Sequence, residues 1–158
     1  MDRAEIERYA RGPEQFHAAY AGLSRGDLLA FPIPGTWSIQ QIAVHLLESD
    51  LIASHRMKRI VAEDRPLLIG YDETKFAQSL FYDDEPLDEV LTLFQLNRTQ
   101  TARILRKLPD TAFARRGVHN ERGLVTLGEM VSDYAQHLDH HLAFVVKKRT
   151  LLGKPLPG

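Results

Sequence analysis

The chain has 158 residues, of which 44% are hydrophobic and 26% are charged, and its formal net charge is -1. A chain of this size can form one domain with its own core, and its balanced charge provides no broad field that attracts a nucleic-acid backbone or an anionic lipid surface. The sequence contains no cysteine, which excludes disulfides and cysteine-ligated zinc and fits a reducing, cytoplasmic compartment. We therefore expect one domain over residues 1–158, in the cytoplasm, with no nucleic-acid or membrane partner.

The first segment, residues 2–23, has apolar residues at helical spacing but is interrupted by Gly12-Pro13. Because proline lacks an N–H group and clashes with the preceding turn, we predict a kink or a short first helix there. The start of the segment is polar, so we expect no signal peptide. Residues 31–35 include two prolines and a glycine, and they are predicted not to be helical.

The second helix is predicted to begin after Ser38, because Ser38 and Gln41 have the spacing of a capping box. It extends to about residue 63, before Pro66. Its apolar stripe consists of Ile39, Ile42, Ala43, Leu46, Leu47, Ala53, Met57, Ile60 and Val61. Asp50 lies inside this stripe, which is unusual for a carboxylate.

Residues 66–84 are predicted to form a long connection with a short helix around residues 74–80. A third helix begins near Pro86 and ends at about residue 108. Residues 115–123 are predicted to be a polar loop, and Thr126 and Glu129 form a second capping box before a helix that ends at about residue 149. No window alternates cleanly, so no strand is predicted. This pattern predicts an all-α, four-helix bundle with one long crossover connection.

His137 and His141 form an i, i+4 pair in the last helix. Helical geometry places His141 about 40° and His137 about 80° from the centre of the apolar stripe, on the same flank, while His140 lies roughly 140° away and should face water. This spacing lets two imidazoles converge on one metal ion. Two hydrogen-bonded histidines at the edge of the core are the alternative. Leu138 stands where the HExxH proteases carry their glutamate, so protease chemistry is disfavoured.

A third nitrogen ligand must come from another helix, and His45 is the candidate. The angular count places it about 120° from the main stripe of its helix, so geometry alone predicts that His45 is exposed to solvent. His17, His55 and His119 are also expected at the surface.

Two segments resemble the DinB-like, YfiT-type superfamily of metal-dependent proteins. The first is Pro34-Gly35-Thr36-Trp37-Ser38-Ile39-Gln40-Gln41-Ile42-Ala43-Val44-His45-Leu46, and the second runs from Gly123 to Glu129 and on through Tyr134-Ala135-Gln136-His137-Leu138-Asp139-His140-His141. The resemblance implies a four-helix bundle, frequently dimeric, in which three histidines hold a divalent ion such as zinc or nickel. Carried over by position, the ligands are His45, His137 and His141. Members of the superfamily include S-transferases that use low-molecular-weight thiols and isomerases of maleylpyruvate.

Three neutral imidazoles leave a divalent ion its full charge and open positions, as in catalytic sites. The leading hypothesis is therefore a metal-dependent enzyme that transfers a small-molecule thiol to an electrophile. A hydrolase that uses water is one alternative, and a non-catalytic dimer that binds a metal or small molecule is another. Candidates for catalytic support are Tyr134, one turn before His137 in the last helix, and Asp50 and Arg56 in the second helix. Asp50 could orient a histidine or pair with Arg56 or Arg59, and a buried structural ion pair is the alternative. Tyr134 and Trp37 could instead serve only in packing.

Overall fold

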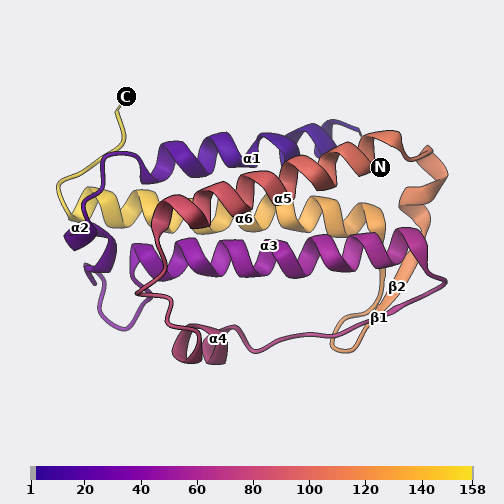
Figure 1. The fold of residues 1–158 in the computed structure, drawn as a ribbon, viewed down its shortest axis with the longest axis horizontal. Helices are drawn as coiled ribbons and strands as arrows, with labels where there is room; N and C mark the ends of the chain where they lie inside the picture. Colours follow the sequence, from indigo (N-terminus) through magenta and orange to yellow (C-terminus); the bar gives the residue numbers. More distant parts are fainter. Residues whose placement is uncertain (1–2, 158) are drawn as a thin grey trace.

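Four long helices lie side by side in the computed structural model, which describes residues 3–157 (Figure 1). They are α1 (Ala4–Tyr20), α3 (Ile39–Ala62), α5 (Leu87–Lys107) and α6 (Leu127–Leu151). Both α5 and α6 pack against α1 and against α3. A long crossover between α3 and α5 contains the short helix α4 (Glu73–Ser79) and returns the chain to the end where α3 began (Figure 1). The predicted four-helix bundle with one long crossover is confirmed.

Both predicted capping boxes form and begin the two helices that carry the candidate ligands. The Ser38 hydroxyl accepts from the Gln41 backbone N–H at 3.1 Å, and the Gln41 side chain accepts from the Ser38 N–H at 3.1 Å. Thr126 and Glu129 make the same pair of hydrogen bonds, at 3.1 and 2.7 Å. Each box satisfies two N–H groups that a helix start leaves without partners.

α1 continues through Gly12-Pro13 as one helix, so the expectation of a short first helix is wrong. Pro13 has no N–H for the Tyr9 carbonyl four residues earlier, and Arg98 of α5 fills that role, since its Nη1 donates to the Tyr9 oxygen at 3.1 Å. A Cβ atom at Gly12 would lie 2.3 Å from the same Arg98 nitrogen. Gly12 therefore leaves space for the Arg98 guanidinium. Pro13 leaves the Tyr9 carbonyl free to accept a hydrogen bond from it. After α1 comes a short helix, α2 (Arg25–Leu29), that was not predicted.

A small three-stranded sheet at one end of the bundle corrects the prediction that the chain has no strands. It consists of β1 (Leu67–Leu68), β2 (Arg116–His119) and β3 (Gly123–Thr126), in the order β1-β2-β3. β1 is parallel to β2, whereas β2 and β3 form an antiparallel hairpin. Residues 115–123, predicted as a loop, thus contain a strand, which follows the 3-10 helix η1 (Asp110–Ala114). Strands of two to four residues are too short to show a readable alternation.

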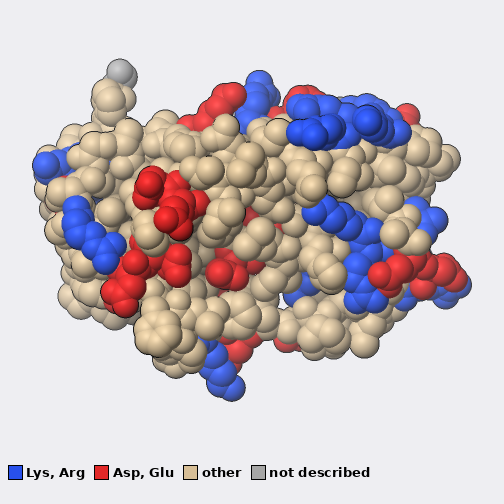
Figure 2. Space-filling model, viewed as in Figure 1, with Lys and Arg blue, Asp and Glu red and all other residues tan. Residues whose placement is uncertain are grey.

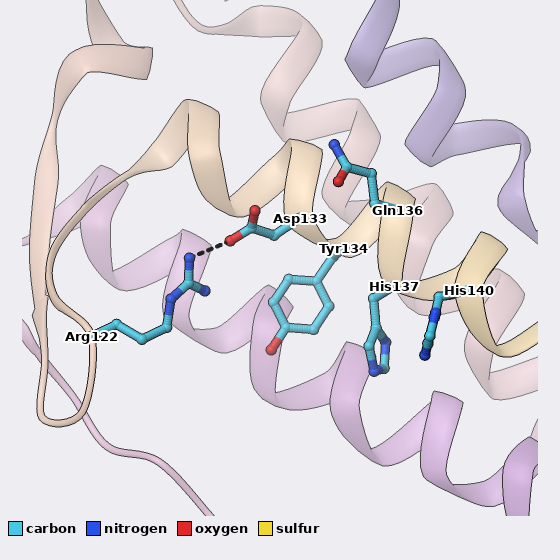
Figure 3. Close-up of a pocket in the computed structure, with 6 residues that line it drawn as sticks. All are labelled: Arg122, Asp133, Tyr134, Gln136, His137 and His140. Atoms are coloured by element: carbon cyan, nitrogen blue, oxygen red, sulfur yellow. Dashed lines mark hydrogen bonds and ion pairs between the residues drawn. The ribbon is translucent and has the colours of Figure 1, made fainter.

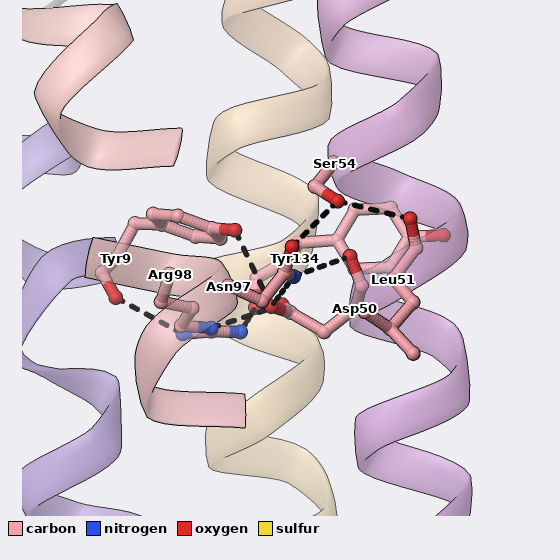
Figure 4. A network of polar contacts seen from close by, with 7 residues as sticks. All are labelled: Tyr9, Asp50, Leu51, Ser54, Asn97, Arg98 and Tyr134. Carbon is pink, nitrogen blue, oxygen red and sulfur yellow. Dashed lines mark hydrogen bonds and ion pairs between the residues drawn. The ribbon is translucent and has the colours of Figure 1, made fainter. Parts of the chain in front are cut away.

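A buried polar layer crosses the bundle between two apolar core clusters. In every long helix the clusters divide at the same level, for example between Leu47 and Ala53 in α3. Asp50 lies in this gap, and its carboxylate accepts from Arg98 Nε at 2.9 Å and from Asn97 Nδ2 at 2.8 Å (Figure 4). The pairing of Asp50 with Arg56 or Arg59 does not form, and the alternative, a buried structural ion pair, is confirmed with Arg98 of α5 as its cation.

Groups of both charge signs are scattered over the face seen in Figure 2, between larger uncharged areas. Acidic side chains gather around the start of α5, whose first turn carries Asp88 and Glu89, and basic ones gather toward its end, which carries Arg106 and Lys107. This arrangement complements the helix dipole. Within the described residues, no helix is long and apolar enough to cross a membrane.

Candidate metal centre

Three imidazoles from two helices meet at one point beside the core. His45 comes from α3, and His137 and His141 come from successive turns of α6. One nitrogen from each ring lies within 4.8 Å of those from the other two. The Nε2 atoms of His45 and His137 are 3.3 Å apart, and the His45 ring centroid lies 4.7 Å from that of His141. The structure therefore brings together the three residues that the resemblance implied.

His45 is fully buried, with 0% of its surface exposed, so the angular prediction of solvent exposure is wrong. That prediction assumed one apolar stripe facing one core. Near its start α3 is instead buried on all sides, since every residue from Ile42 to Leu47 is buried. A helix covered all round has no solvent face at that level. Trp37 adds to this cover, because its ring centroid lies 4.8 Å from that of His45.

Burial makes the three imidazoles neutral at physiological pH. It lowers the pKa of His45 to about 3, and repulsion from His141 acts in the same direction. The pKa of His137 falls to about 3 and that of His141 to about 4, again chiefly through burial and then through the neighbouring histidines. A neutral imidazole offers the unprotonated nitrogen that a metal ion requires.

The spacing and chemistry of these nitrogens fit a divalent ion. Two nitrogens bound to one tetrahedral zinc at about 2.0–2.1 Å are roughly 3.4 Å apart, close to the 3.3 Å between His45 and His137. Imidazole is also a ligand that suits zinc and nickel. His45 Nδ1 is buried without a hydrogen-bond partner, so nothing in the described chain fixes the tautomer of this ring.

The remaining four histidines do not join the centre. His17, His55 and His140 are exposed, as predicted. His119 was also expected at the surface, but it is only 5% exposed, because it sits in β2 and its side chain points inward. Its Nδ1 accepts from the Glu121 backbone N–H at 3.2 Å, so His119 has a structural partner.

Of the three weaker candidates, Tyr134 and Arg56 lie beside the centre and Asp50 belongs to the buried polar layer. The Tyr134 ring centroid is 5.8 Å from that of His137, and Arg56 Nη1 donates to the Tyr134 hydroxyl at 3.3 Å. Arg56 is 6% exposed and also donates to the Ile69 carbonyl in the crossover. Tyr134 and His137 line a cavity of about 440 Å³ on the α6 side (Figure 3).

Glu73, which the sequence reasoning missed, places a carboxylate next to the triad. Its Oε2 lies 3.8 Å from His45 Nε2, and its side chain is 58% exposed. Glu73 is the first residue of α4, in the crossover. No periodic pattern or motif in that connection marks it, so only the path of the folded chain reveals its position.

Comparisons with known proteins agree with this fold and give the family of the chain. The model of the DinB superfamily matches residues 8–145. The chain belongs to the DinB superfamily. This DinB chain is 32% identical to a protein of Oceanobacillus iheyensis over 70% of its own length and 64% of that relative, which is less than two thirds. It is 26% identical to a protein of Halalkalibacterium halodurans over 84% of this chain and 77% of the relative. Both relatives carry the name "Putative metal-dependent hydrolase".

The fold of this DinB chain also matches a solved structure. YfiT from Bacillus subtilis, described as a probable metal-dependent hydrolase with an unusual four-helix bundle topology, superposes with a TM-score of 0.90. The match covers 95% of this chain and 86% of YfiT, at 23% sequence identity. At that identity the likeness establishes the shared fold.

Proposed function

We propose that this chain is a divalent-metal-dependent enzyme whose ion, zinc or nickel, is held by His45, His137 and His141. The observation that carries the proposal is the meeting of three neutral imidazole nitrogens within 4.8 Å at a point bordered by cavities. The names of the relatives point in the same direction. An ion held by three neutral ligands lowers the pKa of a water or thiol that it binds and so supplies a nucleophile near neutral pH.

The protein side chains around this point can manage the accompanying proton. The Glu73 carboxylate, 3.8 Å from His45 Nε2, is placed to accept a proton from the nucleophile. The Tyr134 hydroxyl accepts a hydrogen bond from Arg56, which leaves its own proton free to be donated to substrate. Asp50 has no direct part in this chemistry, since its carboxylate is occupied by Arg98 and Asn97.

The identity of the nucleophile separates two reactions. Water would make the enzyme a hydrolase, and the names of the relatives favour this reaction. A small thiol would make it an S-transferase, as the resemblance to thiol transferases implies, and the absence of cysteine from the chain means that this thiol would come from solution. Two assays distinguish these reactions. A hydrolase should cleave p-nitrophenyl esters, and an S-transferase should conjugate monobromobimane with cysteine or bacillithiol. Full metal content without either activity would favour the non-catalytic binding module.

Metal analysis of protein purified without an affinity tag tests the proposal. We expect near-stoichiometric metal in the parent and its loss in His45→Ala and His141→Ala. His55→Ala is the matched control, because it removes an exposed histidine from α3. A parent that stays metal-free after incubation with zinc and with nickel would overturn the proposal.

We also propose that the enzyme is a homodimer that works in the cytoplasm on a small-molecule substrate. The resemblance supports dimerisation, and the lack of cysteine fits a reducing compartment. Light scattering during size-exclusion chromatography measures the oligomeric state directly, and a mass of one chain would refute the dimer.

A further inference from the structure

A second cavity, of about 300 Å³, adjoins the triad at His141. Its walls are mainly apolar and include Ile33, Trp37, Ile42 and Phe144, while Lys148 lies in its lining two helical turns beyond His141. The volume is at the lower end of the range for small-molecule sites. The cavity therefore suits a small organic molecule with an apolar body.

Lys148 brings a buried positive charge to this cavity. The residue is 1% exposed, and its Nζ donates to the Thr36 hydroxyl at 2.5 Å. Within residues 3–157 no carboxylate lies within 4.0 Å of that nitrogen, and no second acceptor bonds to it. An ammonium group has three N–H donors, so two of them have no partner. A buried charge without a counter-ion is costly, and a bound anion would remove that cost.

The surroundings of Lys148 strengthen the need for a negative partner. The Thr36 hydroxyl is already used, because it donates to the Ile33 carbonyl at 2.8 Å. Burial lowers the pKa of the Lys148 ammonium, and the charge of Lys147 acts in the same direction. Lys147 also lines the cavity. Two lysines thus border one small apolar space in which the described chain places no acidic side chain.

The cavity on the other side of the triad is different. Its guanidinium, Arg122, is already paired with Asp133 at 2.6 Å. That cavity has no buried cation without a partner, so an anionic ligand gains less there than beside Lys148.

We propose that the cavity between His141 and Lys148 binds the substrate as an organic carboxylate, with its anionic group on Lys148 and its apolar body against Trp37 and Phe144. The binding of an organic carboxylate in this cavity is independent of the proposed function. The statement that this molecule is the substrate rests on the proposed function. His141 and Lys148 are two turns apart on α6, about 10 Å along the helix axis. The carboxylate and the reacting group of the substrate should therefore be separated by several carbon atoms.

Binding of 4-phenylbutyrate and of its neutral amide, 4-phenylbutyramide, tests this site. Trp37 is the one tryptophan in the chain and lines the cavity, so its fluorescence reports binding at this place. The titration is done with EDTA present, so that the carboxylate cannot bind through a metal ion. If neither probe binds, the metal site can still be demonstrated by the metal analysis. If the parent is metal-free, the titration can still demonstrate the carboxylate site.

We expect the parent to bind the carboxylate roughly 10- to 100-fold more tightly than the amide, as for a hydrogen bond to a charged group. Lys148→Met should abolish this preference, whereas Lys107→Met, which removes a lysine from the far end of α5, should retain it. The proposal would be overturned if the parent binds the two probes equally or binds neither. It would also be overturned if the preference for the carboxylate persists in Lys148→Met. If circular dichroism shows that Lys148→Met is unfolded, the comparison of the two probes in the parent decides.

Discussion

His45 Nε2 lies 3.3 Å from His137 Nε2, although 92 positions separate these residues in the chain. Two ring nitrogens can approach so closely only if at least one carries no proton, and burial keeps both rings from taking up a second proton. The folded protein therefore holds basic nitrogens in a state that an unfolded chain would not maintain in mild acid. This difference has a measurable consequence.

We predict that the metal-free protein loses stability as the pH falls from about 6.5 toward 3. The pKa values of His45, His137 and His141 are about 3, 3 and 4 in the folded state, below the unfolded value of about 6.5. Between these limits the unfolded chain binds protons that the folded chain does not, so the free energy of unfolding decreases as the pH falls. Urea unfolding in EDTA across this range measures the slope. The variant His45→Gln/His137→Gln should have a shallower slope, and equal slopes would contradict the prediction.

Glu73→Gln should lower kcat by about 10²- to 10⁴-fold, the usual contribution of a general base. The amide keeps the size of the side chain but cannot accept the proton that the carboxylate near His45 would take. Metal content should not change. Glu89→Gln, which alters an exposed carboxylate on α5, should retain full activity. An unchanged kcat in Glu73→Gln would exclude this carboxylate as the proton acceptor.

Asp50→Ala should destabilise the fold by about 3–5 kcal/mol, because it leaves the buried Arg98 guanidinium without its counter-ion. Glu7→Ala is the matched control, since it removes the carboxylate partner of Arg106 at the surface and should cost at most about 1 kcal/mol. Chemical denaturation of the two variants gives the comparison. Similar losses in both would mean that the buried pair is no more important than the exposed one.

Gly12→Ala should cost about 1–3 kcal/mol through overpacking. The added methyl group would lie 2.3 Å from Arg98 Nη1 and 2.7 Å from Leu138 Cδ2. Arg98 cannot move aside easily, because Asp50 and two backbone carbonyls hold it. Gly26→Ala meets only an ordinary contact at 3.7 Å and should leave thermal stability nearly unchanged. A Gly12→Ala variant as stable as the parent would show that the layer around Arg98 adapts.

Local signals in the sequence predicted most of the fold. Ser38 with Gln41, and Thr126 with Glu129, marked the helix starts because a capping box involves only neighbouring residues. The i, i+4 spacing likewise put His137 and His141 on one flank of a helix. The burial of His45 was not predictable in this way, because it depends on how α6 and Trp37 pack over α3.

The position of Glu73 and the pairing of β1 with β2 depend on the path of the crossover, which no local pattern encodes. The partner of Asp50 was missed for a similar reason, since Arg98 lies on a helix that is distant in sequence. Local patterns therefore predicted where the long helices begin, whereas the contacts between helices were not encoded in them, and the meeting of His45 with His137 and His141 was expected only from the family resemblance.

The placement of two ligands on α6 and one on α3 would let a bound ion act as a cross-link. It would join positions 45 and 137, closing a loop of 92 residues in a chain that has no cysteine for a disulfide. Closing a long loop in the unfolded chain removes much of its conformational freedom, which favours the folded state. A bound ion would thus also raise the free energy of unfolding of the bundle, and chelation would lower thermal stability as well as remove activity.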